Sequence, residues 1–451
     1  MGQPFGGSRR KGGGRKAVKL YRTGEAAFDE ALERLTNRME LFSSDVVKVV
    51  DDIVADVRAE GDEALVRYTE QFDGLRLSLE EIRVPPSAFK EAARRVGRST
   101  LRALRVAADR IEAYHRRQVE DGWFYDEDGE ISLGLLVRPL HRVGLYVPGG
   151  KAAYPSTVLM SAIPARVAGV EELAMCVPSQ TKRPKPVVLA AALVAGIEEV
   201  YRVGGAQAIA AFAYGTETIP RVDKIVGPGN VYVAAAKRAV YGLVDIDMLA
   251  GPSEIVVVAD ESAEADFVAA DLLSQLEHDE LAVAVLVTTS EALASDVKRE
   301  VAAQKRRLKR KRIIGAALKG LSAIFVVESL LEATEVANAV APEHLELAVK
   351  EPLKLLPLIS NAGAVFLGNY TPEAVGDYLA GPSHVLPTGG TARFSSPLGV
   401  YDFIKRSSVI STSREALKKL AKTTIALAEL EGLDAHAEAV RLRLGRRRRR
   451  K

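Results

Sequence analysis

Gln275 and His278 form the first pair of residues whose types and spacing could support chemistry. They lie three positions apart in a segment whose apolar pattern predicts a helix, so their side chains share one helical face. An imidazole nitrogen and an amide oxygen that point the same way suit a borderline or hard metal ion. When the pair is considered alone, a capping or core role is the alternative.

Glu343 and His344 are adjacent and follow Pro342, which predicts that a helix begins at this point. At the N-terminus of a helix, both side chains can reach the same ligand. A carboxylate that orients water and an imidazole that takes up protons form a general acid–base pair. The segment therefore indicates a catalytic site, and an ordinary helix start is the alternative.

Asp377 and His384 are separated by Gly381-Pro382, which breaks any helix between them. A loop that holds a carboxylate and an imidazole is a good place for a ligand and a substrate contact. An ordinary turn with a surface histidine explains the same residues. Glu431 and His436, near the C-terminus, carry no signal of their own.

The order of the predicted strands and helices indicates how these residues are positioned. From residue 143 to residue 255, buried-strand patterns alternate with helical patterns, which predicts βαβ units on a parallel sheet. The same alternation resumes up to residue 367 and predicts a second α/β domain. Ligands of such sheets bind at the carboxyl ends of the strands. Three Gly-rich turns are expected there, at Pro148-Gly-Gly150, Gly204-Gly205 and Gly227-Pro-Gly229.

Length and composition indicate a globular protein with more than one domain. The 451 residues exceed the roughly 250–300 at which a single core stops growing. Hydrophobic residues make up 47% of the chain and charged residues 27%, as in ordinary globular proteins. No apolar run reaches the roughly 18–20 residues of a membrane span, and the N-terminus lacks the apolar core of a secretory signal. We therefore expect a cytoplasmic protein without a membrane partner.

The net charge of +3 comes from the two ends of the chain. Residues 1–19 contain six basic and no acidic residues, and the chain after Glu438 contains eight basic and no acidic residues. Without these fourteen charges, the rest of the chain carries about −11. Runs of like charge repel and are typically disordered. Non-specific contact with nucleic acid is an alternative for the tails alone, so we expect no specific nucleic-acid partner.

The single cysteine, Cys176, excludes an intrachain disulfide and a cysteine-based zinc site. It lies in an apolar segment, residues 172–178, whose pattern predicts a strand. A small buried residue is the favoured interpretation, and a catalytic nucleophile is the alternative.

Taken together, the motifs resemble the histidinol dehydrogenase family, and they occur in the order of that family over nearly the whole chain between the tails. Examples are Val143-Gly-Leu-Tyr-Val-Pro-Gly-Gly150, Lys224-Ile-Val-Gly-Pro-Gly-Asn230 and Ala341-Pro-Glu-His344. The other matching segments are residues 155–160, 204–211, 247–254, 272–278, 376–378, 384–388 and 431–433, with His436. Two residues depart from the pattern, Leu276 between the expected metal ligands and Pro382 before Ser383.

The resemblance implies that the chain oxidises L-histidinol through L-histidinal to L-histidine, the last steps of histidine biosynthesis, with two NAD⁺ and one Zn²⁺ per subunit. It implies a homodimer with shared active sites, in which His436 comes from the other subunit. The implied zinc ligands are Gln275, His278, Asp377 and His436.

The resemblance also implies the remaining site residues. Glu343 and His344 are the implied catalytic pair: His344 takes the alcohol proton and Glu343 helps activate a water that attacks the aldehyde. Without a cysteine in any motif, oxidation of a hydrated aldehyde fits better than a covalent thioester. The implied NAD contacts are Tyr146, Gln207 and Asn230. The implied substrate contacts are Ser253, Gln275, His278, Glu343, Asp377, His384, Glu431 and His436.

The predicted fold class is α/β, with two incomplete, parallel-sheet Rossmann-like domains, helical N- and C-terminal arms, and an aldehyde-dehydrogenase-like architecture. We expect NAD to bind residues 143–255, and the metal and catalytic motifs to lie in a domain of residues 41–142 and 256–398. The remaining predicted parts are a disordered basic tail at 1–19, helical arms at 20–40 and 399–445, and a second basic tail at 446–451.

Two other enzyme classes could use part of this set. A related dehydrogenase for another diol, such as a sulfonated propanediol, would keep the zinc site and the Glu-His pair. Glu431 argues against it, because a carboxylate repels a sulfonate and attracts an imidazole N–H. A zinc hydrolase would leave Tyr146, Gln207 and Asn230 unexplained.

Overall fold

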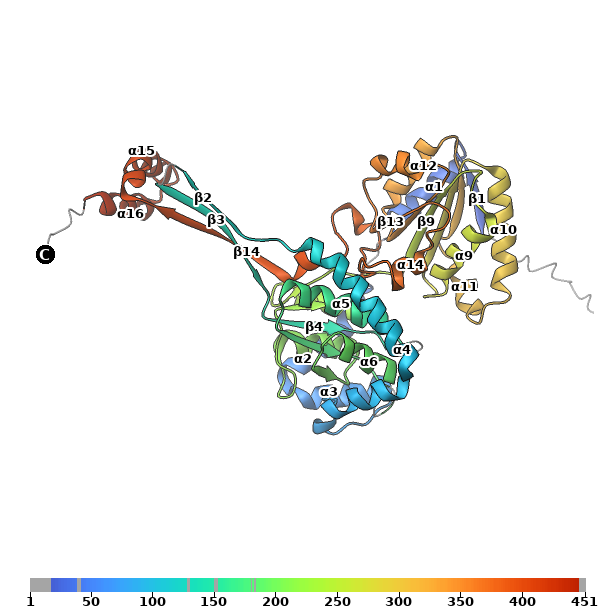
Figure 1. Ribbon diagram of the computed structural model, residues 1–451, viewed down its shortest axis with the longest axis horizontal. Helices are drawn as coiled ribbons and strands as arrows, with labels where there is room; N and C mark the ends of the chain where they lie inside the picture. The colour runs from blue at the N-terminus through green and yellow to red at the C-terminus, as the bar shows by residue number, and fades with distance from the viewer. Residues whose placement is uncertain are drawn as a thin grey trace, which may run out of the picture.

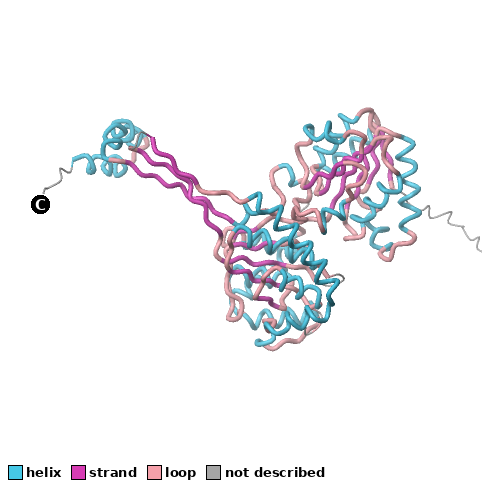
Figure 2. Tube along the Cα trace, in the orientation of Figure 1, coloured by secondary structure: helices cyan, strands magenta, loops and turns pink. Residues whose placement is uncertain are grey.

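The computed structural model describes residues 18–38, 42–127, 130–149, 153–179, 181 and 184–445. These residues form two α/β domains and a long arm that projects from one of them (Figures 1 and 2). Most of the predicted N-terminal tail, and all of the C-terminal tail, lie outside the described residues. Within the described residues, no helix is both long enough and apolar enough to cross a membrane.

One domain is built on a five-stranded parallel sheet, which we call the five-stranded domain. Its strand order is β6-β5-β4-β7-β8, so the order reverses between β4 and β7. The strands are β4 (Arg142–Tyr146), β5 (Glu172–Cys176), β6 (Glu199–Tyr201), β7 (Lys224–Val226) and β8 (Asp245–Ile246). The connecting helices are α5 (Pro155–Ala168), α6 (Pro186–Val194), α7 (Gly205–Tyr214) and α8 (Val231–Val240). This is the predicted Rossmann-like alternation.

The helices before this sheet also pack on the five-stranded domain. They are α2 (Ser44–Glu60), α3 (Asp62–Asp73) and α4 (Pro86–His115). The apolar stripe of α2 packs with α7 and α8 on one face of the sheet, and α4 packs with α5 and α6 on the other. The prediction that residues 41–142 join residues 256–398 is therefore wrong, because the apolar faces of α2 and α4 complete the two layers around the five-stranded sheet.

The second domain, which we call the six-stranded domain, has a parallel sheet of order β1-β11-β10-β9-β12-β13. Apart from β1, this order repeats the order of the five-stranded sheet. The strands are β1 (Lys19–Arg22), β9 (Glu254–Ala259), β10 (Val283–Thr288), β11 (Ala323–Val326), β12 (His344–Ala348) and β13 (Ala364–Leu367). The helices are α1 (Ala26–Thr36), α9 (Ala265–Leu276), α10 (Glu291–Lys305), α11 (Lys311–Ala317), α12 (Leu330–Val340), α13 (Pro352–Leu355) and α14 (Glu373–Tyr378).

Residues 20–40 do not form the predicted helical arm. Strand β1 pairs with β11 at the edge of the sheet, and Phe28 and Leu35 of α1 are buried in the same apolar cluster as α12. The start of the chain therefore belongs to the six-stranded domain. The chain then crosses to the five-stranded domain between α1 and α2, and it returns between β8 and β9.

The arm is a three-stranded antiparallel sheet with two helices at its tip (Figure 1). Its strands are β2 (Trp123–Glu127), β3 (Ile131–Pro139) and β14 (Ile404–Thr412), and its helices are α15 (Arg414–Leu430) and α16 (Asp434–Gly445). The two helices follow the pattern predicted for the C-terminal arm, with Gly432 between them at a φ of 71°. The prediction of a helical arm over residues 399–445 is wrong for Ile404–Thr412, which form β14 because they pair with β3 from a distant part of the chain.

Where the two domains meet, one sheet presents the carboxyl ends of its strands and the other presents the amino ends. The loop after β4 leads into α5, whose Thr157 hydroxyl lies 3.2 Å from His384 Nε2. The segment from β8 enters the amino end of β9, and on the way Gly251 N–H donates to the Thr388 hydroxyl at 2.5 Å. The carboxyl edge of the five-stranded sheet thus faces the amino edge of the six-stranded sheet. Short 3-10 turns complete the described fold at Leu79–Glu81, Arg116–Gln118, Leu356–Leu358, Thr391–Arg393 and Val400–Phe403.

Candidate functional site

Glu343 and His344 stand at the amino end of β12. Helix α12 ends at Val340, the left-handed φ of 48° at its C-cap Ala341 turns the chain, and Pro342 follows. His344 then begins a strand that lies between β9 and β13 and is buried along its whole length. The predicted helix start is therefore wrong: the run from His344 is a central parallel strand that is buried on both faces, with Leu345 and Leu347 on one face and His344 and Glu346 on the other.

The His344 ring is held in one orientation. Its Nδ1 lies 3.0 Å from the backbone oxygen of Glu254 and 3.3 Å from the Gln275 amide nitrogen, which also donates to Glu343. Because the carbonyl is the nearer partner and can only accept, the ring proton is placed on Nδ1 and the lone pair on Nε2. Nε2 is buried without a hydrogen-bond partner and lies 3.8 Å from an Asp377 carboxylate oxygen. Burial lowers the pKa of His344 to about 4. The side chain is thus a neutral base aimed at an acidic cluster.

The Glu343 carboxylate is anchored beside this ring. Its Oε2 accepts from Glu254 N–H at 2.9 Å and from the Gln275 amide at 3.2 Å. Burial, and then the charge of neighbouring carboxylates, raises its pKa well above the ordinary value. A carboxyl group whose pKa is moved toward neutrality can exchange protons during a reaction.

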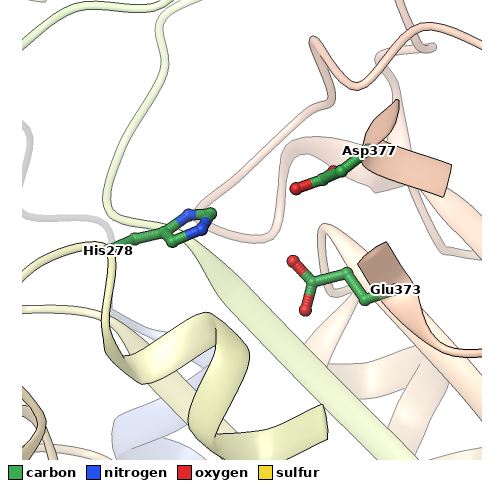
Figure 3. A group of neighbouring side chains, drawn as sticks. All are labelled: His278, Glu373 and Asp377. Carbon is green, nitrogen blue, oxygen red and sulfur yellow. The ribbon is translucent and has the colours of Figure 1, made fainter. Parts of the chain in front are cut away.

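A candidate metal site lies beside His344, whose Nε2 is 3.8 Å from an Asp377 oxygen and 4.0 Å from a Glu373 oxygen; Figure 3 shows its side chains. One ligand atom each from His278, Glu373 and Asp377 lies within 4.8 Å of the others. His278 follows the end of α9, whereas both carboxylates come from the short helix α14. Gln275, one turn before His278, is fully buried and its amide oxygen has no hydrogen-bond partner. Buried polar atoms are rarely left unpaired, so this oxygen marks a place for a ligand.

Of the four predicted metal ligands, the structure brings His278 and Asp377 together, and Gln275 lies one helical turn before His278 with its amide nitrogen 3.3 Å from His344 Nδ1. It adds Glu373, which sequence analysis missed. The signal that could have found it is its spacing of four residues from Asp377, which puts both carboxylates on one helical face. Glu373 is buried, and its Oε2 accepts from the Ser274 hydroxyl at 3.0 Å.

The fourth predicted ligand, His436, is not near this cluster. It is exposed on α16 at the tip of the arm, and Glu431, also exposed, lies at the end of α15. Figure 1 shows these helices at the opposite end of the molecule from α9 and α14. Within one chain, neither residue reaches the site.

His384 and Ser253 lie at the boundary between the domains. His384 Nδ1 is 3.1 Å from the Asp377 backbone oxygen, and burial lowers the pKa of its ring. Ser253 is half-buried immediately before β9. The two residues that differ from the family pattern, Leu276 and Pro382, do not displace His384 or Ser253. Leu276 is buried in the core of the six-stranded domain, and Pro382 is half-buried beside Ser383.

The predicted NAD contacts follow the carboxyl edge of the five-stranded sheet. Tyr146 ends β4, and its buried hydroxyl accepts from Gly205 N–H at 3.1 Å. Gln207 is buried in the first turn of α7, and its side-chain oxygen has no partner. Asn230 caps α8 by accepting from two backbone N–H groups. Gly227 lies in the turn after β7, where a Cβ would come within 2.1 Å of the Tyr146 backbone oxygen.

Comparison with known proteins identifies the relatives of this chain. Residues 36–444 match the sequence profile of the histidinol dehydrogenase family. The chain is 52% identical to a histidinol dehydrogenase from Syntrophotalea carbinolica over 95% of this chain and 99% of that protein. It is 54% identical to one from Aquifex aeolicus over 92% of this chain and 96% of that protein.

Comparison with solved structures points to the same family. The crystal structure of histidinol dehydrogenase from Elizabethkingia anophelis aligns with a TM-score of 0.89 at 37% identity, covering 95% of this chain and 98% of the other. A putative aldehyde dehydrogenase from Anabaena variabilis aligns with a TM-score of only 0.41 at 15% identity, covering 88% of this chain and 98% of the other. That likeness is too weak to support an argument about function.

The burial of His344 makes the free energy of unfolding depend on pH. The unfolded imidazole takes up a proton near pH 6.5, whereas the folded one does so only near pH 4. Between these values the unfolded state binds more protons, so stability falls as the pH falls through this range. We expect His344 to account for a loss of about 3 kcal/mol. Denaturant unfolding of the metal-free protein at pH 6.5 and pH 4 should show a smaller loss for His344→Asn than for the wild type.

The control for this measurement is His141→Asn, which changes an exposed histidine. It should keep the pH dependence of the wild type. An equal loss of stability in the wild type and in His344→Asn would contradict a buried neutral imidazole.

Proposed function

The chain belongs to the histidinol dehydrogenase family, and from this premise we propose that the cluster beside Glu343 and His344 is its active site. The chain is an NAD-dependent oxidoreductase that oxidises L-histidinol through L-histidinal to L-histidine. The observation that carries the assignment of the site is the unpartnered, buried Nε2 of His344, aimed at the group of His278, Glu373 and Asp377.

Zn²⁺ is the metal that these residues would hold. Gln275, His278 and Asp377 offer an amide oxygen, an imidazole nitrogen and a carboxylate oxygen, which are donor types that zinc accepts. The fit rests on the unpartnered oxygen of Gln275 and on the convergence of His278 with two carboxylates. When bound, the metal supplies a Lewis acid that holds the imidazole and amino nitrogens of the substrate.

His344 acts as the base in the alcohol step. Its Nε2 carries the lone pair, because Nδ1 donates to the Glu254 backbone oxygen. It takes the hydroxyl proton of the substrate while a hydride leaves for NAD⁺. A base with a lowered pKa is neutral at pH 7 and is therefore ready to accept this proton.

Glu343 acts in the aldehyde step. Its carboxylate orients a water molecule and takes a proton from it as the water adds to the carbonyl carbon. The anion of the hydrate formed in this way then transfers a hydride to a second NAD⁺ and becomes the carboxylic acid. Cys176 has no part in this chemistry: it is buried in β5, and burial raises the pKa of its thiol well above the ordinary value, whereas reactive thiols have a lowered one.

NAD⁺ is the hydride acceptor, and its site lies at the reversal of strand order between β4 and β7. Crevices of this kind bind nucleotides in doubly wound sheets. Tyr146, Gln207 and Asn230 lie along this edge, and the buried unpartnered oxygen of Gln207 supports a ligand there. Because this edge faces the amino edge of the six-stranded sheet, a nucleotide bound there would lie toward His344.

The substrate contacts include residues of both domains and of a second subunit. Ser253 and His384 lie at the domain boundary, together with the metal-site residues and Glu343. The Glu431 carboxylate can accept a hydrogen bond from the imidazole N–H of histidinol. The same negative charge would repel the sulfonate of a sulfonated diol. Because Glu431 and His436 cannot reach the site within one chain, a second copy must supply them.

The arm supports the proposal of a homodimer with shared sites. Its strands and terminal helices expose large apolar side chains that a monomer would leave in water, among them Phe124, Ile410 and Leu430. Exposed apolar surface of this kind is typical of protein–protein contacts. An arm that crosses to a second copy would cover these side chains and carry His436 to the partner's metal site.

His344→Asn should keep the fold and bind zinc, but it should lose turnover by roughly 10²–10⁴-fold, because it removes the base of the alcohol step. Steady-state formation of NADH from L-histidinol measures turnover, and metal analysis measures zinc. His141→Asn serves as the control. Wild-type turnover in folded, zinc-loaded His344→Asn would remove this residue from the mechanism.

His436→Ala should weaken zinc binding by at least about 10-fold. If the ligand crosses the dimer, mixing His436→Ala with His344→Asn should create one intact site per mixed dimer. Because random exchange makes half of the dimers mixed, activity should recover to about a quarter of the wild-type value. An absence of recovery at every mixing ratio would indicate that the ligand acts within one subunit.

A further inference from the structure

Arg38 is a buried cation outside every motif that predicted the site. It follows α1, at the point where the chain leaves the six-stranded domain. Its Nη2 donates to Glu254 Oε2 at 2.6 Å, and its Nε donates to the other oxygen of the same carboxylate. Both side chains are 4% exposed. A third nitrogen donates to the backbone oxygen of Leu35, which fixes the guanidinium to the end of α1.

Glu254 is the residue on which both members of the catalytic pair depend. Its backbone N–H donates to the Glu343 carboxylate, and its backbone oxygen accepts from His344 Nδ1. The two peptide groups of one residue therefore orient the two catalytic side chains. A displacement of Glu254 would move both together and would release the proton on Nδ1 from its acceptor.

We propose that Arg38 acts through the Glu254 carboxylate as a positioning residue for both oxidation steps. The proposal deepens the proposed function and rests on the roles given there to Glu343 and His344. Arg38 touches neither member of the pair. It fixes the side chain of the residue whose backbone holds them.

The geometry requires arginine rather than a cation of any kind. A guanidinium presents two parallel N–H groups to one carboxylate and so fixes its position and its rotation, whereas a lysine ammonium acts as a point charge. The only other group bonded to this carboxylate within the described residues is Gly389 N–H, at 3.2 Å from Oε1. One such bond leaves the carboxylate free to turn.

The arrangement predicts a distinctive kinetic effect. Arg38→Lys keeps the buried charge but loses the paired bonds, so we expect kcat to fall by about 10–100-fold, the effect of a small misplacement of catalytic groups. The fall should be similar with L-histidinol and with L-histidinal as substrate, because both steps use side chains held by Glu254. The KM for NAD⁺ and the zinc content should stay close to wild type, since Arg38 contacts neither site.

Two further variants separate positioning from folding. Arg38→Gly opens a space for free guanidinium ion, which should restore part of kcat in both steps. The double variant Arg38→Met with Glu254→Gln removes both charges, so it avoids the unfolding that one unpaired buried charge can cause. It should fold and still show the loss in kcat.

The matched control is Arg22→Lys. Arg22 pairs with Glu291 in the same domain, but both side chains are about half exposed, at 49% and 53%. This variant should have wild-type kcat with both substrates.

The result that would overturn the inference is a folded Arg38→Lys or double variant with wild-type kcat in both steps, while His344→Asn measured in parallel is inactive. A loss of thermal stability without a change in kcat would likewise reduce Arg38 to a structural role. If His344→Asn itself turned over like the wild type, the role proposed for His344 would fail instead. The two failures are thus distinguishable.

Discussion

The site depends on one constraint, which is that every polar group taken out of water must find a partner. Glu343, His344, Gln275 and Glu373 are buried where the two domains meet. Most of their polar atoms are satisfied by fixed groups of the protein, above all by the two peptide groups of Glu254. Gln275 Oε1 and His344 Nε2 are left over. Since unpaired buried atoms are costly, their position indicates where a metal ion and a substrate would complete the structure.

The fold satisfies this constraint by using one topology twice. Apart from the edge strand β1, both sheets have the same strand order around an inner strand, β4 in one and β9 in the other. The five-stranded sheet presents its carboxyl edge with the Gly-rich turns, as doubly wound sheets usually do. The six-stranded sheet presents its amino edge instead, where Glu254 begins β9 and His344 begins β12. In the proposed function, the nucleotide and the proton acceptor would therefore be held by different domains and would face each other.

The part of this arrangement that the sequence predicts is local. The spacing of Gln275 and His278 predicts a shared helical face, and the alternation after residue 143 predicts the parallel sheets. The features that the sequence does not predict depend on contacts between residues that are far apart in the chain. Strand β12 was expected to be a helix because Pro342 resembles a helix start, and its burial between β9 and β13 cannot be read from residues 343–348. Residues 41–142 were assigned to the wrong domain because an amphipathic stripe predicts burial but not the sheet that covers it. Glu373 was missed because, apart from Asp377, its neighbours in the site come from distant parts of the chain, α9 and β12.

The number of NADH molecules formed per L-histidinol by zinc-loaded Cys176→Ala enzyme tests the central claim most directly, which is that one thiol-free site performs both oxidations. The account predicts two NADH per L-histidinol, with L-histidine as the product. One NADH per L-histidinol from the folded variant, with accumulation of L-histidinal, would contradict it, because the aldehyde step would then require the cysteine.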